Sequence, residues 1–151
     1  MTDRANIERF NTVTLHLITR LYESFPTPYD ITDENIIDFG FEPVPADATA
    51  EEAWEIGTSL PHVLSFLQEE GFLRYQPDPN GREQFWRVRL TLKGLTIMRL
   101  PTALEPGSGK SLYERAKESL GSLSKAAGTE AGKHVVAEIF KLAVFGLRGG
   151  G

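Results

Sequence analysis

Hydrophobic residues in the first part of the chain recur with the spacing of one long helix. Between Asn6 and Phe25 they fall three or four positions apart, and two prolines follow directly. Apolar residues at i, i+3, i+4 and i+7 form one helix face, and proline ends a helix. The pattern predicts a helix over residues 6–25 with an inward stripe of Ile7, Phe10, Leu17, Ile18, Leu21 and Phe25.

The next segment, residues 27–49, carries a weaker pattern. Thr32 followed by Glu34 can begin a short helix that Gly40 ends, and the sequence EPVPAD then forms a loop. A helix begins again at Ala50 and falters at Gly57.

A third helix is predicted after this break. Thr58 or Ser59 can cap it, and Pro61 is tolerated in its first turn. Gly71 is the expected left-handed stop. A single kinked helix running through Pro61 is the alternative. In either case one face is apolar and consists of Leu60, Val63, Leu64 and Leu67.

Beyond Gly71 the pattern changes to that of a β-hairpin. The segments FLRYQ and FWRVRL flank Asn80-Gly81, the strongest hairpin signal in the chain. Alternation places Trp86, Val88 and Leu90 on one face of the second strand, and Arg87 and Arg89 on the other. Trp86 lies at a core periodicity, as do Trp54 and the phenylalanines, and we interpret most of these aromatic residues as packing. Thr91 can then cap a short helix, LKGLTIMRL, that Pro101 ends.

Two phrases in this region carry a family resemblance. Leu67-x-x-x-Gly71-Phe72-Leu73 followed by a hairpin resembles the third helix and wing of a winged helix-turn-helix domain, and Leu90-Thr91-x-x-Gly94 resembles the start of the helix after the wing in many bacterial regulators. The resemblance covers about residues 7–100 and extends to uncharacterised bacterial and phage-borne winged-helix proteins with a helical tail. It implies a mainly α fold with a small β-hairpin (α+β), and a DNA-binding regulator of transcription, which we expect to act as a dimer.

Charge is distributed unevenly along the chain. Residues 1–71 carry three basic and fourteen acidic side chains, whereas residues 72–100 carry six basic and two acidic ones. A basic segment in an acidic protein indicates where an anionic partner binds. The candidate contacts to double-stranded DNA are Ser59, His62 and Ser65 on the third helix, and Arg82, Arg87, Arg89 and Lys93 in and after the hairpin.

The third helix departs from the family in one respect. Its outward positions hold no permanent cation, and Glu69 and Glu70 repel phosphate, whereas a DNA-contacting helix usually presents arginine, lysine, asparagine or glutamine. The alternative function is therefore a winged-helix interaction module that binds a protein partner, a membrane surface or a second copy through its tail.

The last third of the chain is predicted to be a separate helical element. We expect a winged-helix domain over residues 1–100, a linker over 101–110 and a helical tail over 111–151. The tail holds a long apolar stripe that must be buried against its own domain, a second copy or lipid. We expect a homodimer whose interface includes Gly128, Gly132, Val135, Ile139 and Leu142.

No catalytic, metal or cofactor site is expected. The sequence GSGKS lacks the first glycine and the preceding strand of a phosphate loop. Glu130 and His134 share a helix face without a third ligand. The chain has no cysteine, no signal-peptide pattern and no apolar run long enough to span a bilayer, so we expect a cytoplasmic protein that is not an enzyme.

Overall fold

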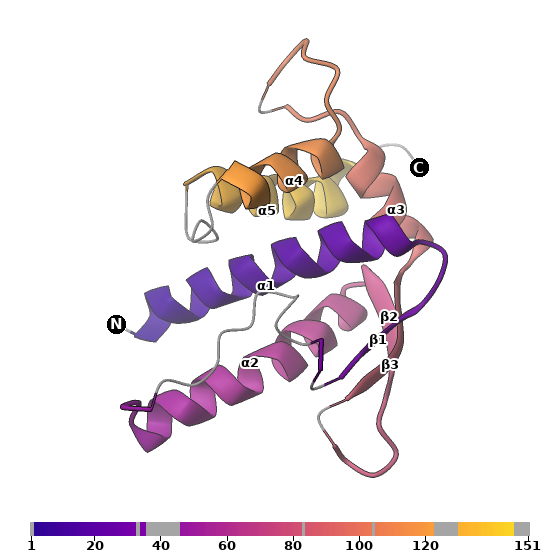
Figure 1. Ribbon diagram of the computed structural model, residues 1–151. Helices are drawn as coiled ribbons and strands as arrows, with labels where there is room; N and C mark the ends of the chain where they lie inside the picture. The colour runs from indigo at the N-terminus through magenta and orange to yellow at the C-terminus, as the bar shows by residue number, and fades with distance from the viewer. Residues whose placement is uncertain are drawn as a thin grey trace.

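The structure, a computed structural model, describes residues 2–32, 34–35, 46–82, 84–103, 105–122 and 130–146, without the side chains of residues 2–6, 55–59, 121–122, 130–131 and 145–146. Figure 1 shows α1 through the middle, α2 on one side of it, α4 and α5 on the other, and the sheet at one end. The α+β class is confirmed. The elements are α1 (Thr2–Ser24), β1 (Tyr29–Ile31), α2 (Ala50–Glu69), β2 (Leu73–Pro77), β3 (Phe85–Leu90), α3 (Leu92–Arg99), α4 (Leu112–Ser122), α5 (Glu130–Lys141) and a π-helical turn, η3 (Leu142–Gly146).

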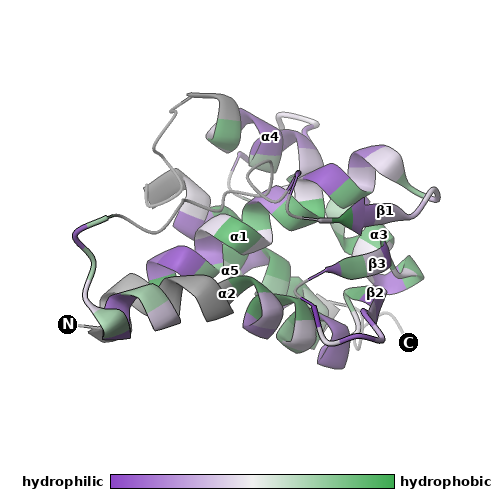
Figure 2. Ribbon diagram, turned by 60° about the horizontal axis from the view of Figure 1, so that its bottom comes forward, coloured by the Kyte–Doolittle hydropathy of each residue, from purple (hydrophilic) through white to green (hydrophobic). Residues whose placement is uncertain are grey.

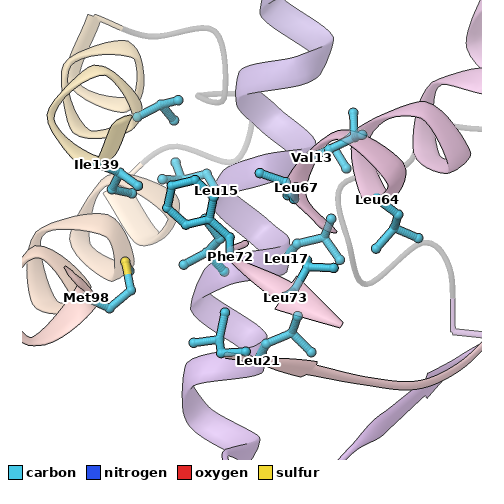
Figure 3. Close-up of a cluster of buried hydrophobic side chains, with 14 of the residues drawn as sticks. Val13, Leu15, Leu17, Leu21, Leu64, Leu67, Phe72, Leu73, Met98 and Ile139 are labelled. Atoms are coloured by element: carbon cyan, nitrogen blue, oxygen red, sulfur yellow. The ribbon is translucent and has the colours of Figure 1, made fainter. Parts of the chain in front are cut away.

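Helix α1 is the centre of the hydrophobic core. The predicted helix is confirmed, but its middle is buried on most sides, because α2 and β3 contact one side and α4 and α5 the other. Val13 and Leu15 are buried together with the predicted Leu17, Ile18 and Leu21 (Figure 3). Ile7 is exposed, against the prediction, since the packing begins farther along the helix.

Helix α2 is one continuous helix that contains Pro61, so the predicted break at Gly57 is wrong and the single helix of the alternative is confirmed. Its start is a capping box, in which Thr49 Oγ1 accepts from the Glu52 N–H at 3.1 Å and Glu52 Oε1 accepts from the Thr49 N–H at 2.9 Å. Pro61 lies inside the helix, which tolerates one missing bond because Leu60, Val63, Leu64 and Leu67 are buried as predicted.

Gly71 ends α2 as predicted. It has a φ of +84°, and the N–H of Phe72 donates to the carbonyl oxygen of Leu67 at 2.9 Å, while the N–H of Gly71 donates to that of Gln68 at 3.0 Å. These two bonds form a Schellman motif. The turn delivers Phe72 and Leu73 into the core (Figure 3).

Thr91 and Gly94 join α3 to this turn. The Thr91 hydroxyl donates to the carbonyl oxygen of Gly71 and accepts from the Gly94 N–H at 3.1 Å, so it caps α3 and ties it to the end of α2. A Cβ on Gly94 would lie 2.4 Å from the carbonyl oxygen of Phe72. In this structure the residues of the Leu-Thr-x-x-Gly phrase therefore hold α3 against the turn that ends α2.

The sheet contains one strand more than predicted. The hairpin of β2 and β3 is confirmed, and β1 pairs with the other edge of β3, giving the antiparallel order β1-β3-β2. β1 has three residues, too few for an alternation signal. The short helix expected after Thr32 lies largely outside the described residues. Amide side chains block both edges, since Gln68 Oε1 accepts from the Tyr75 N–H and Asn35 Nδ2 donates to the Asp30 carbonyl oxygen.

The tail folds back onto α1. Leu112, Ala116, Val135, Val136 and Ile139 belong to the same core as α1 and the sheet. Figure 2 shows hydrophobic residues gathered where α1, α2, α5 and the strands face one another. The apolar stripe of the tail is therefore buried against its own domain, which is the first of the three alternatives given above. The predicted tail and residues 1–100 share one hydrophobic core.

The predicted linker is also held in place. Pro101 and Ser111 form a β-bridge, and the Thr102 N–H donates to the Lys110 carbonyl oxygen at 2.9 Å. The buried carboxylate of Glu138 on α5 accepts from Thr102 Oγ1 at 2.9 Å and from the Ala103 N–H at 2.7 Å. These bonds fix the loop to the last helix of the core.

The contact between α1 and α4 is expected to weaken in acid. Glu23 Oε2 accepts from Tyr113 Oη at 2.6 Å and from Lys117 Nζ at 2.8 Å, and these bonds, that from Lys117 foremost, lower the pKa of Glu23 from its ordinary value of 4.5. Because the pKa is lower in the folded chain, this stabilisation is present above about pH 4.5 and is lost as pH falls through the folded pKa.

Urea unfolding at pH 7 and at about pH 3 measures this effect. Glu23→Gln should lower the midpoint more at pH 7 than in acid, where a smaller fraction of the Glu23 carboxylate is ionised; both changes are small, because the pair is solvent-exposed. Glu51→Gln, at an exposed position on α2, is the control. An equal loss at both pH values in the Glu23 variant would contradict the ionic explanation.

Candidate nucleic-acid interface

Arginines lie directly opposite each other on the solvent side of the hairpin. The register of β2 and β3 pairs Arg74 with Arg89 and Gln76 with Trp86. Paired residues share a face of the sheet, and Leu73 with Leu90 occupies the other face, which is buried. We call Arg74, Gln76, Trp86, Arg87 and Arg89 the outer face of the sheet; the helices contact the opposite side (Figure 1).

A β-bulge at Arg87 changes which residues of β3 point outward. Arg87 has a φ of 55°, and the register of β3 shifts at this point against both neighbouring strands. Phe85, Val88 and Leu90 are buried, whereas Trp86 is half-buried on the outer face. The predicted inward position of Trp86 is therefore wrong, because the extra residue exchanges it with Phe85.

Asp30 holds this bulge in place. Its Oδ1 accepts from the backbone N–H of Arg87 at 2.8 Å. Asp30 lies between the half-buried Tyr29 and the buried Ile31 of β1, so it borders the outer face. The Arg87 side chain is exposed beside it.

The guanidinium groups of the outer face lack ion-pair partners within the described part of the chain. By contrast, the cations of the loop before α4 and of α4 itself are paired: Lys110 with Glu105 and Glu118, Arg115 with Glu105, and Lys117 with Glu23. Like charges opposite each other across two strands are destabilising. An anion that binds between Arg74 and Arg89 would remove this repulsion, and a guanidinium fork matches phosphate oxygens.

The predicted contacts on α2 are only partly available. His62 is exposed, Ser65 is half-buried and hydrogen-bonds Tyr75, and the side chain of Ser59 is not among those described. Phe66, Glu69 and Glu70 are exposed farther along the helix. This end of α2 therefore offers acidic and apolar groups beside one histidine.

The predicted basic residues fall into two groups. Arg82, Arg87 and Arg89 are exposed in the hairpin. Lys93 lies on α3, where its Nζ donates to the carbonyl oxygen of Glu70 at 2.9 Å and sits 5.3 Å from the centre of the Phe72 ring. Lys93 thus stabilises the end of α2. Arg74, which was not among the predicted contacts, lies opposite Arg89 instead of Lys93. The alternation within FLRYQ is a signal that could have placed Arg74 on the solvent side, but its partner depends on the register.

The predicted interface residues of the tail lie mostly inside the chain. Val135 and Ile139 are buried in its core, Gly132 is buried, and Leu142 is partly buried against the core. Gly128 lies outside the described residues. Val135 and Ile139 are therefore covered by the chain itself and form no surface that a second copy can contact in this fold.

Comparison of the chain with protein-family models, with curated proteins and with solved structures gave no match. Among the described helices, none is long and apolar enough to cross a membrane. The described residues contain no group of three or more histidine and acidic side chains placed to hold a metal ion. The function is therefore inferred from the geometry of the outer face.

Proposed function

We propose that the chain is a DNA-binding protein of winged-helix type, with the hairpin of β2 and β3 as its wing. Arg74 and Arg89 contact phosphates of the duplex, with Arg87 and Arg82 beside them. The observation that carries this proposal is the cross-strand pair of exposed arginines without a carboxylate partner among the described residues. Such contacts give affinity independent of base sequence.

The role of α2 follows from its exposed groups. His62 is placed to approach a base edge or a phosphate, whereas Glu69 and Glu70 disfavour close approach of the helix end to the backbone. We propose that the outer face supplies most of the affinity and that residues around His62 supply a lesser contact. Regulation of transcription and action as a dimer stay predictions within this proposal.

The test is binding of a fluorescent duplex of about 20 base pairs, measured by anisotropy between about 50 and 200 mM salt. Arg74→Ala with Arg89→Ala should weaken binding and reduce the salt slope by about 0.9 for each phosphate that the variant no longer neutralises. Arg87→Gly removes a third cation, and glycine adopts positive φ readily.

The matched control is Arg99→Ala with Lys141→Ala, which removes the same charge from exposed positions on α3 and α5. It should leave the affinity nearly unchanged. Equal losses in the two double variants, or no binding by the intact protein at about 50 mM salt, would refute the proposal.

A second candidate function is an interaction module, which one apolar surface favours. Phe10, Phe66 and Phe140 form an aromatic cluster with ring centroids 5.5 to 6.2 Å apart. Phe66 is 42% exposed, and Ile7 and Val144, one helical turn from Phe10 and Phe140, are exposed as well. Light scattering over a range of concentrations shows whether this surface joins copies of the chain.

A further inference from the structure

The bulge at Arg87 places an aromatic ring on the solvent side of the sheet. Simple alternation would bury Trp86 with Val88 and Leu90; instead Phe85 fills the core position and packs edge-on against Tyr75, with ring centroids 5.6 Å apart. Trp86 is left half-buried on the outer face, among the arginines. The largest aromatic side chain of the hairpin therefore contributes only part of its surface to the core.

The polar atom of this ring is already satisfied within the chain. Trp86 Nε1 donates to Asp78 Oδ1 at 3.0 Å, and the other carboxylate oxygen of Asp78 accepts from the N–H groups of Asn80 at 3.0 Å and Arg82 at 3.3 Å. The bond from Trp86 is the largest cause that lowers the pKa of Asp78, so the acceptor is ionised at neutral pH. Because indole has one donor and no acceptor, the exposed part of the ring offers a ligand only apolar and π surface.

The ring lies beside the paired arginines. In the register of the hairpin, the Gln76–Trp86 pair is next to the Arg74–Arg89 pair on the same face. Two residues along a strand are about 7 Å apart, so the long arginine side chains and the indole ring can contact the same nucleotide. Cationic groups that hold phosphates, combined with an aromatic ring, are the pattern of single-strand binding surfaces.

We propose that the outer face also binds an unpaired base, stacked on Trp86, while its phosphates contact Arg74 and Arg89. This inference rests on the proposed function, since the phosphate contacts are shared. In a continuous duplex the base faces are covered by their neighbours, so only an unpaired base presents its π surface to the ring. The protein then prefers nucleic acid with a single-stranded segment over continuous duplex of equal length.

The emission of Trp86 reports this contact directly. Trp54→Phe changes a residue that is 71% exposed on α2 and leaves Trp86 as the single tryptophan. Oligo(dT) should quench the remaining emission on binding, whereas inorganic polyphosphate, which has charge but no base, should not. A titration with oligo(U) shows whether the bound base comes from RNA or from DNA, because only RNA carries the 2′-hydroxyl. Quenching by oligo(dT) or by oligo(U) supports the inference.

A binding experiment with the full chain complements the emission. Trp86→Leu should weaken binding of oligo(dT) about tenfold and weaken duplex binding less, because the phosphate contacts of Arg74 and Arg89 remain. Trp54→Leu is the matched control and should change neither affinity. A thermal melt of each variant establishes that it is folded, and the emission experiment leaves Trp86 itself intact.

The outcomes separate this inference from the proposed function. Bound oligo(dT) that leaves the Trp86 emission unchanged, or polyphosphate that quenches it equally, would overturn the stacked base while duplex binding stands. Binding of oligo(dT) with quenching but no binding of duplex would support the inference and contradict the duplex proposal. No binding of either nucleic acid would overturn both.

Discussion

Replacing Ile139 with aspartate is expected to cost on the order of 4 kcal/mol or more of folding free energy. Ile139 is 0% exposed and lies in the core where α5 packs against α1 and α4 (Figure 3). A carboxylate there loses its water and would have to take up a proton or force α5 away from α1. Urea unfolding followed by far-UV circular dichroism measures the loss.

Ala137→Asp is the control, because Ala137 is exposed on the same helix and the change adds the same charge. It should lower stability by less than about 1 kcal/mol. If Ile139→Asp instead left unfolding unchanged and altered only the molar mass, α5 would form an interface between copies, as the apolar stripe alone suggests.

Gly94→Ala is expected to destabilise the chain by about 3 kcal/mol. The added Cβ would meet the Phe72 carbonyl oxygen at 2.4 Å and the Leu90 Cδ2 at 3.2 Å. The carbonyl belongs to the turn that ends α2 and accepts from the Thr91 N–H, so it cannot move without breaking that bond. Relief of the clash therefore separates α3 from the hairpin.

Thr96→Ala gives the comparison for this helix. Thr96 is exposed on α3, and alanine has the higher helix propensity, so the variant should be as stable as the parent or slightly more stable. Thermal and urea unfolding of both variants provide the measurement. A Gly94→Ala protein of parental stability would show that α3 does not approach Phe72 this closely.

The candidate interface could be predicted only in part from the sequence. The Asn80-Gly81 turn and the flanking alternation identified a hairpin with exposed arginines, because these signals act between neighbours in the chain. They did not identify the partner of Arg89. The loop over residues 78–84 is longer than a two-residue turn, and the pairing with Arg74 depends on the register that the bulge and the core packing select.

The outward position of Trp86 was unpredictable for a related reason. The bulge at Arg87 is held by Asp30, 57 residues earlier in the chain, in a three-residue strand that carries no pattern of its own. Alternation assumes an unbroken ladder, so it assigned Trp86 to the core in place of Phe85. A hydrogen bond between distant residues leaves no periodic signal in either segment.

What the sequence determined by itself was local structure: the long first helix, the glycine stop at Gly71, the hairpin and the threonine cap of α3. These depend on backbone preferences and hydrogen bonds over a few residues, which composition and spacing express directly. The tertiary structure alone decided which surfaces meet. The apolar stripe at Val135 and Ile139 showed that another surface must cover it. The hydrophobic effect has no direction, so the sequence cannot say which surface does this. Only the three-dimensional packing shows that it is α1.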